Sequence, residues 1–134
     1  MKAPKPFPTP GLLLLVLLLL CPWRRVSAEQ PQSPVVRLAQ LEIDPAQLEN
    51  YKAALKEEIE TSIRVEPGVL TLYAVALKDN PSEIRLFEIY ADPAAYKAHL
   101  ESPHFKKYKT VTQGMVKSLK LLETDPIVLG TKSR

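Results

Sequence analysis

Hydrophobic residues follow two different periods between residues 35 and 123. They alternate, or run on with many β-branched members, over 35–43, 69–78, 83–91 and 116–123, which is typical of β-strands. Between the first two of these segments, apolar positions recur every three to four residues, as on one face of an amphipathic helix. This stripe consists of Leu48, Tyr51, Leu55, Ile59 and Ile63. The pattern therefore predicts a helix that runs to about residue 63.

Two Asp-Pro pairs predict the starts of helices. Asp44 and Asp92 are favourable N-cap residues, and the proline after each fits the first helical position. Gln47 stands where a capping box places Glu or Gln. The second helix is expected to break near Pro103 and to restart toward Gln113. The predicted order of elements is β-α-β-β-α-β.

This order is that of an α+β, ferredoxin-like fold, in which an antiparallel sheet carries its helices on one face. The strand over 69–78 is apolar on both faces, with Val69, Tyr73 and Val75 expected on one and Leu72 on the other. Since helices cover only one face, a large apolar sheet surface would remain exposed. We therefore predict that two chains pack sheet to sheet as a homodimer and close a dimeric α/β barrel. A monomer with a half-apolar face is the alternative.

The N-terminal segment has the pattern of a secretory leader. An apolar run over 11–21 follows two lysines, and it is short for a membrane span. Small residues precede a cut after Ala28, so we predict a signal peptide over 1–28, a flexible tether over 29–34 and the domain over 35–134. The expected location is periplasmic or secreted, with no membrane contact after cleavage. An uncleaved anchor, or a lipoprotein attached through Cys21, are the alternatives.

Removal of the leader changes the charge of the chain. Residues 1–28 hold four of the 18 Lys and Arg and none of the 15 Asp and Glu, which leaves the remaining residues at net −1. A nucleic-acid partner is therefore not expected. The single cysteine, Cys21, also leaves, so the mature domain has neither a disulfide nor a thiol nucleophile.

Four short segments together resemble a known family. They are Glu66-Pro67-Gly68, the sequence FEIYAD over 87–92, His99, and SPHF over 102–105. This combination, within about residues 35–125, resembles the antibiotic-biosynthesis monooxygenase (ABM) domain family and its quinol monooxygenase-like members. The resemblance implies a dimeric α/β barrel that oxidises a small aromatic or quinol-like compound with O₂, without flavin or metal. The leader is a departure from a mostly cytoplasmic family.

Such a reaction is chemically compatible with this chain. A deprotonated hydroquinone can itself pass an electron to O₂, so the protein has to supply a dry pocket and a base. The chain has no Gly-rich phosphate loop, and we predict no bound flavin or nicotinamide. Non-catalytic binding of a small hydrophobic ligand by the same barrel is the alternative function.

His99, His104 and Glu88 are the candidate catalytic residues. Histidine as a residue type is a common general base near neutral pH, so either could be the base, and the helix break at Pro103 allows the two to converge. A histidine that only bridges the helix break is the alternative. Glu88 shares a strand face with apolar residues, so it must be paired, for example with Arg37, or have a raised pKa.

Four aromatic residues are candidates for substrate binding. Tyr73 and Tyr90 lie on adjacent strands of the predicted hairpin and could offer hydroxyl groups to a planar ligand. Phe87 and Phe105 could contact the same ligand or serve only the core. The segment over 105–109, FKKYK, is expected to be a solvated helix face. A metal site made of the two histidines and Glu88 is an alternative that no known ligand spacing supports.

Overall fold

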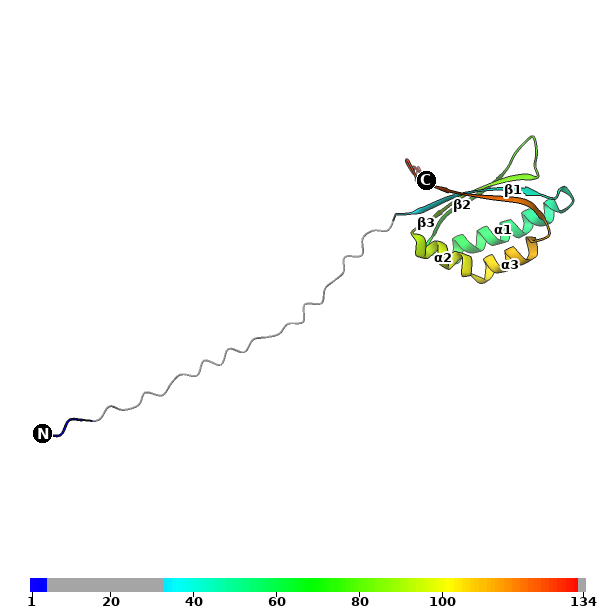
Figure 1. Cartoon of the computed structure of the whole chain (residues 1–134). Helices are drawn as coiled ribbons and strands as arrows, with labels where there is room; N and C mark the ends of the chain where they lie inside the picture. The colour runs from blue at the N-terminus through cyan, green and yellow to red at the C-terminus, as the bar shows by residue number, and fades with distance from the viewer. Residues whose placement is uncertain (5–32, 133–134) are drawn as a thin grey trace.

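The computed structural model describes residues 1–4 and 33–132 (Figure 1). The predicted signal peptide and tether lie almost entirely outside the described residues. No helix within the described residues is long and apolar enough to cross a membrane. The elements are β1 (Val35–Ile43), the 3-10 helix η1 (Pro45–Gln47), α1 (Leu48–Val65), β2 (Val69–Ala76), β3 (Glu83–Tyr90), α2 (Pro93–Glu101), α3 (Pro103–Thr112) and β4 (Val116–Thr124).

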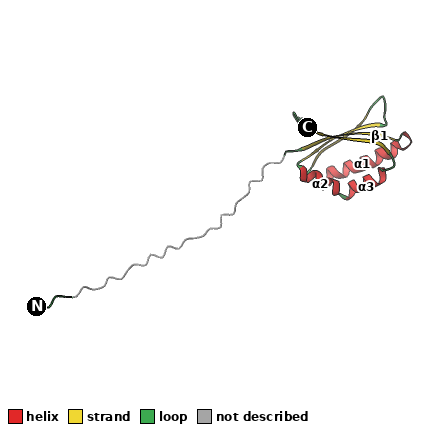
Figure 2. Cartoon of the chain, in the orientation of Figure 1, coloured by secondary structure: helices red, strands yellow, loops and turns green. Residues whose placement is uncertain are grey.

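The four strands form one antiparallel sheet in the order β2-β3-β1-β4. All three α-helices lie against one face of this sheet (Figure 2). The ferredoxin-like α+β fold predicted from the hydrophobic pattern is therefore confirmed. The last described segment, 125–132, adds no strand, and Ile127 and Val128 in it are exposed.

The first helix begins later than predicted. The Asp44 carboxylate accepts a hydrogen bond from the Ala46 N–H at 3.0 Å, and this contact caps the short η1 turn instead of an α-helix. The α1 helix starts at Leu48. Gln47 makes no capping-box bond, because its Oε1 accepts from Asn50 Nδ2 at 2.9 Å.

The break in the second helical segment is confirmed. Ser102 ends α2 by donating its N–H to the His99 carbonyl at 3.0 Å. The same residue caps α3, because its Oγ accepts from the Phe105 N–H at 3.3 Å. The two helices therefore meet at one serine, which places His99 in the last turn of α2 and His104 in the first turn of α3.

The predicted faces of β2 are wrong at its first residues. The pairing of β2 with β3 shifts between Val69 and Thr71, as in a β-bulge. This shift turns both Val69 and Leu72 into the core, whereas the expected alternation placed Val69 beside Tyr73. Tyr73 pairs with Phe87 of β3 on the opposite, helix-free face.

The main core lies between the sheet and helices α1 and α3. Tyr51 of α1 is fully buried there, and its hydroxyl shares a 2.7 Å hydrogen bond with that of Tyr108 in α3. The buried core residues of this cluster are Ala39, Leu41, Ile43, Tyr51, Leu55, Ile84 and Leu86. Near the other end of the sheet, a smaller cluster of Val69, Leu72 and Tyr90 packs under α2.

Candidate active site

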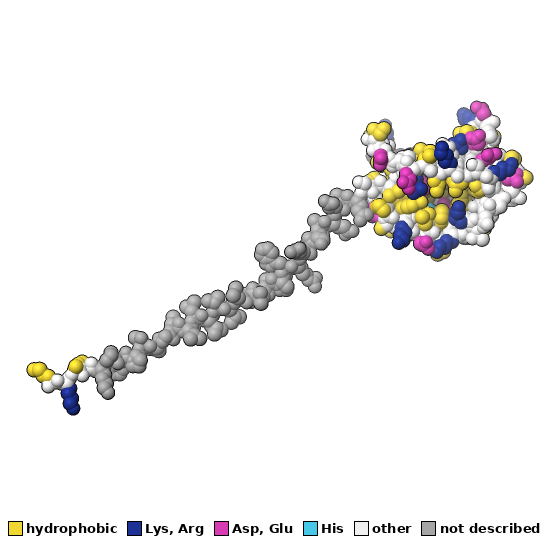
Figure 3. Space-filling view, viewed as in Figure 1, with side chains coloured by type: hydrophobic (Ala, Val, Ile, Leu, Met, Phe, Trp, Pro, Cys, Tyr) yellow, Lys and Arg dark blue, Asp and Glu magenta, His cyan; other side chains and the backbone are white. Residues whose placement is uncertain are grey.

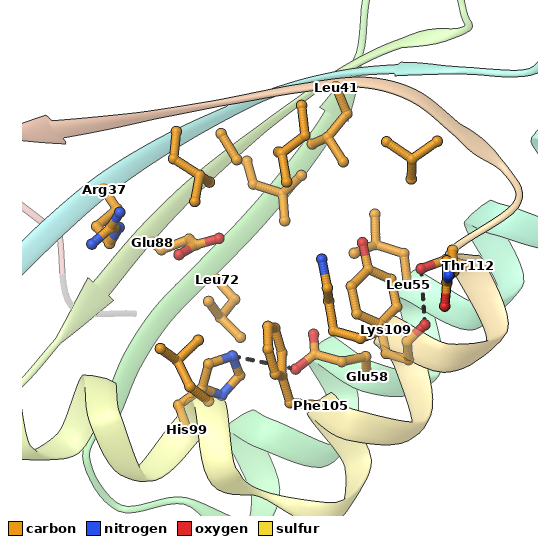
Figure 4. A pocket seen from close by; sticks show the side chains of 18 of the residues that line it. Arg37, Leu41, Leu55, Glu58, Leu72, Glu88, His99, Phe105, Lys109 and Thr112 are labelled. Carbon is orange, nitrogen blue, oxygen red and sulfur yellow. Dashed lines mark hydrogen bonds and ion pairs between the residues drawn. The ribbon is translucent and has the colours of Figure 1, made fainter.

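A cavity of about 510 Å³ lies between the sheet and the helices (Figure 4). This volume is in the range of small-molecule sites. Most of its wall is hydrocarbon, from residues that include Ala39, Leu41, Leu55, Leu72, Leu86, Leu100 and Phe105. Polar side chains complete the wall, and among its carboxyl and imidazole groups Glu58 and His99 are buried and Glu88 is half-buried.

The cavity opens along the edge strand β4. Leu119 and Leu121 line it, yet they are 43% and 49% exposed, because no helix covers the inner side of this strand. Figure 3 shows apolar side chains gathered at this side of the molecule, below the sheet, with charged groups around them. Lys109 of α3 and Lys117 of β4 also line the cavity.

His99 is held by a carboxylate outside the cavity. Its Nδ1 lies 2.9 Å from Glu66 Oε1, and the Nε2 of His104 lies 2.5 Å from the same oxygen. Burial alone would raise the pKa of Glu66, but the hydrogen bonds from the two histidines outweigh it and hold the pKa below its usual range. An ionised carboxylate only accepts hydrogen bonds, so Nδ1 of His99 carries a proton.

This hydrogen bond fixes which nitrogen of His99 can act. With the proton of a neutral imidazole on Nδ1, the lone pair is on Nε2. The rings of Phe105 and Tyr90 lie against the imidazole, at centroid distances of 4.7 and 5.3 Å, and restrict its rotation. His99 is 3% exposed and lines the cavity, so its basic nitrogen is shielded from bulk water.

Glu58 faces His99 within the same cavity. Its Oε1 lies 3.7 Å from His99 Nε2 and accepts from Ser62 Oγ at 2.7 Å (Figure 4). Burial raises the pKa of Glu58, against the lowering effect of the Ser62 hydrogen bond and of His99. Glu58 also borders a second, smaller cavity of about 50 Å³, which His104 lines from α3.

Glu88 lies across the cavity from Glu58, on β3. It accepts a hydrogen bond from the Tyr90 hydroxyl at 3.1 Å, and burial raises its pKa. Arg37 pairs with Glu88 in the β1–β3 register but directs its hydrogen bond to Glu123, at 3.4 Å. Glu88 is therefore a half-buried carboxyl beside apolar neighbours, with one hydroxyl donor.

The family is indicated by a direct match. Residues 34–111 match the family model described as antibiotic biosynthesis monooxygenase. The chain belongs to this family. An ABM-family protein of Bacteroides thetaiotaomicron, assigned as an antibiotic biosynthesis monooxygenase, has a crystal structure that matches with 54% identity and a TM-score of 0.73 over 76% of this chain and 97% of that one.

Two further structures show how far the ABM-family likeness extends. A protein of Lactobacillus acidophilus, assigned as a monooxygenase, is 39% identical with a TM-score of 0.65, over 66% of this chain and 42% of that one. A Nitrosomonas europaea protein is 22% identical with a TM-score of 0.66, over 70% of this chain and 90% of that one, and shares the fold. A comparison with curated proteins found no match.

The structure brings four of the seven candidate residues of this ABM domain together. Glu88, Tyr90, His99 and Phe105 line the cavity. His104 does not, and it reaches the site through Glu66. Tyr73, which is 63% exposed, and Phe87 lie on the helix-free face of the sheet.

The expectation of a solvated face over 105–109 is wrong in part. Lys106 and Lys107 are exposed, but Phe105 and Tyr108 turn inward and line the cavity. A helix that covers a sheet needs an apolar stripe, and in α3 these two aromatic residues, three positions apart, supply it.

Two important residues were missed by the sequence reasoning. Glu58 is not among the candidate residues predicted from the sequence, and Glu66 appears there only within the Glu66-Pro67-Gly68 segment that resembles the family. The buried residues of α1 are in fact Tyr51, Leu55, Glu58 and Ser62. A carboxylate and a serine four residues apart on one helix face were the signal that could have found Glu58.

Beside the ABM cavity, three of the described residues come close enough to be considered as ligands of a metal ion. One atom each of Glu58, His99 and His104 lies within 4.8 Å of the others. The two imidazole centroids are 6.4 Å apart, whereas two rings bound to one tetrahedral ion would lie about 5 Å apart, from a metal–nitrogen distance of about 2.1 Å. Glu66 already accepts from both rings, so we derive no step through a metal.

Proposed function

We propose that this chain is an exported monooxygenase that oxidises a small aromatic or quinol-like compound with O₂, without a flavin or a metal. One observation carries the proposal. His99 presents Nε2 to a largely apolar cavity, while Glu66 holds Nδ1 at 2.9 Å from outside. This is the arrangement that a general base requires: an oriented imidazole, backed by a carboxylate, in a site with little water.

The proposed reaction needs no added reductant. His99 removes a phenolic proton from the bound quinol, and the electron-rich anion gives one electron to O₂. The two radicals then combine to a ring peroxide anion, which takes the proton back from His99 to become the hydroperoxide. The hydroperoxide loses water to give the hydroxyquinone. One quinol and one O₂ become one hydroxyquinone and one water, so the ring supplies all four electrons. Glu88, on the far wall, can hydrogen-bond the second hydroxyl of the quinol.

The helix-free face of the sheet supports self-association as part of this function. Its side chains are largely apolar and include Leu38, Tyr73, Val75, Phe87, Ile89 and Leu122. No helix within 33–132 covers this face, Tyr73 and Val75 on it are exposed, and an apolar surface of this kind is typical of an interface. A second copy packed sheet to sheet would bury it and produce the dimeric barrel. Export through residues 1–28 is part of the same proposal.

Oxygen uptake with 1,4-dihydroxynaphthalene tests the function. After correction for uncatalysed oxidation, the protein is expected to consume one O₂ per quinol, and labelled O₂ should place one oxygen atom in the hydroxynaphthoquinone product. His99→Gln, which removes the base, is expected to lower the rate about 100-fold or more. Glu101→Gln, an exposed position two residues later, is the matched control and should not change it.

Failure of the wild-type protein to increase oxygen uptake with quinols of this class would overturn the proposal. An active wild type with an equally active His99→Gln variant would remove His99 from the mechanism. Circular dichroism of each variant establishes that it is folded, so that loss of rate is assigned to chemistry.

A further inference from the structure

Glu58 has no role in the base mechanism, although its position is specific. It is 5% exposed, on the buried face of α1, and it lines the cavity from the side of the helices. Ser62 donates to its Oε1 at 2.7 Å, which is the same oxygen that lies 3.7 Å from His99 Nε2. Burial of a carboxyl is unfavourable unless its polar atoms are paired, so this pairing with Ser62 is what allows Glu58 to remain there.

The last step of the oxygenation needs an acid as well as a base. The ring hydroperoxide must lose its outer oxygen, and in a cavity with little water a hydroxide ion is a poor leaving group. A proton must therefore reach that oxygen as the O–O bond breaks. His99 is occupied in the same step, because it takes the proton from the peroxide-bearing carbon.

We propose that Glu58 is the general acid of this step and forms an acid–base pair with His99; this inference rests on the proposed function. The C–H bond at the peroxide-bearing carbon breaks, and its electron pair becomes the second bond of a new C=O. The O–O bond breaks heterolytically, and the outer oxygen leaves as water with the proton of Glu58. The carbon's proton goes to His99 Nε2 and then to Glu58, across a gap of 3.7 Å.

Glu58 and Glu66, which flank His99, have pKa values shifted in opposite directions, as separate acid and anion roles require. Burial raises the pKa of Glu58, which favours its protonated, acidic form. The hydrogen bonds from the two histidines lower the pKa of Glu66, which keeps it an anion that orients the base. Opposite shifts on neighbouring carboxyls are the usual way in which one site holds both an acid and a base.

The test measures how oxygen is partitioned between water and hydrogen peroxide. In Glu58→Gln, the amide keeps the shape and can retain a bond with Ser62 but has no acidic proton. The hydroperoxide should then decay by expelling H₂O₂ and leave unhydroxylated naphthoquinone. We expect oxygen uptake to continue, with H₂O₂ per O₂ consumed at least tenfold above wild type after subtraction of the uncatalysed reaction. Glu58→Asp retains a carboxyl and should give an intermediate ratio.

The control is Glu57→Gln, an exposed neighbour in α1 that pairs with Lys107. It should leave the partition unchanged. Two results for Glu58→Gln would overturn the role of Glu58 as the acid. One is an unchanged amount of H₂O₂ per O₂ consumed, and the other is a parallel fall of oxygen uptake, hydroxyquinone and H₂O₂. Either result would leave the proposed function standing. A wild-type protein without oxygen uptake would overturn the function and this inference together.

Discussion

His99 Nδ1 lies 2.9 Å from Glu66 Oε1, and this contact joins the end of α2 to the turn between α1 and β2. The position of the proton on His99, which lines the cavity, therefore depends on Glu66, which does not. Glu66 is 33 positions away in the sequence, at the C-terminal end of α1. The base and the group that orients it thus come from two elements that only the folded domain brings together.

Glu66→Gln is expected to reduce turnover about 100-fold, with little change in substrate affinity. The amide carries no charge to stabilise the imidazolium that forms, and it can donate to Nδ1 and move the ring proton to Nε2. Oxygen uptake gives kcat and KM, and Glu60→Gln on the exposed side of α1 is the control. A variant with the wild-type rate would show that the orientation of His99 does not depend on Glu66.

Tyr108→Phe should lower the free energy of unfolding by about 1–3 kcal/mol, because it leaves the fully buried Tyr51 hydroxyl without its partner at 2.7 Å. The double variant Tyr51→Phe/Tyr108→Phe removes both hydroxyls and should recover most of that loss. Urea denaturation of the wild type, of Tyr51→Phe and Tyr108→Phe alone, and of the double variant measures both effects. Additive losses in the double variant would contradict this account.

Gly68→Ala should destabilise the domain by about 1–3 kcal/mol through overpacking. A Cβ at this position would lie 2.4 Å from Ala95 Cβ in the first turn of α2, and the Gly68 carbonyl accepts from the Ala91 N–H at 2.9 Å. The backbone therefore has no room to withdraw. Gly114→Ala is the control, since no atom lies within 4 Å of its Cβ position. Equal stabilities of the two variants would contradict the prediction.

The element order could be predicted from the sequence because each helix and strand has its own hydrophobic period. The exception is the start of β2, where the shift between Val69 and Thr71 reverses the alternation. A bulge depends on how two strands pair and leaves no mark in the period of one of them. The late start of α1 is similar, because the Asp44 carboxylate accepts from the Ala46 N–H and so caps the η1 turn that precedes the helix.

The site could be predicted only in part, because the burial of an ionisable side chain depends on how the helices and strands pack against one another. Glu88 could be predicted because an ionisable residue on an apolar strand face is unusual, and His99 because histidine is a common base and belongs to the segments that resemble the family. Glu58 was missed because a glutamate on a helix with several others is normally exposed, and only the packing of α1 against α3 buries it. Which of two histidines lines the cavity was set by the break at Ser102.

Phe87→Lys is expected to convert a dimer into a monomer. Phe87 lies on the helix-free face opposite Tyr73, where the proposed partner would pack, and a buried unpaired lysine is strongly unfavourable. Light scattering at micromolar concentration should give twice the chain mass for wild type and the single-chain mass for the variant. Lys56→Gln, an exchange on the exposed side of α1 and away from this face, is the control. A monomeric wild type would contradict the proposed barrel.

Glu88→Gln should stabilise the domain more at pH 8 than at pH 5. Burial raises the pKa of Glu88 in the folded state, so folding favours the protonated form. The stability that this carboxyl contributes is complete below its ordinary pKa of about 4.5 and is lost as pH rises through the higher folded value. Gln resembles the protonated carboxyl and can keep the Tyr90 contact at every pH. Urea denaturation at the two pH values measures the difference, with Glu57→Gln as the exposed control. An equal effect of Glu88→Gln at both pH values would show that the pKa of Glu88 is not altered by folding.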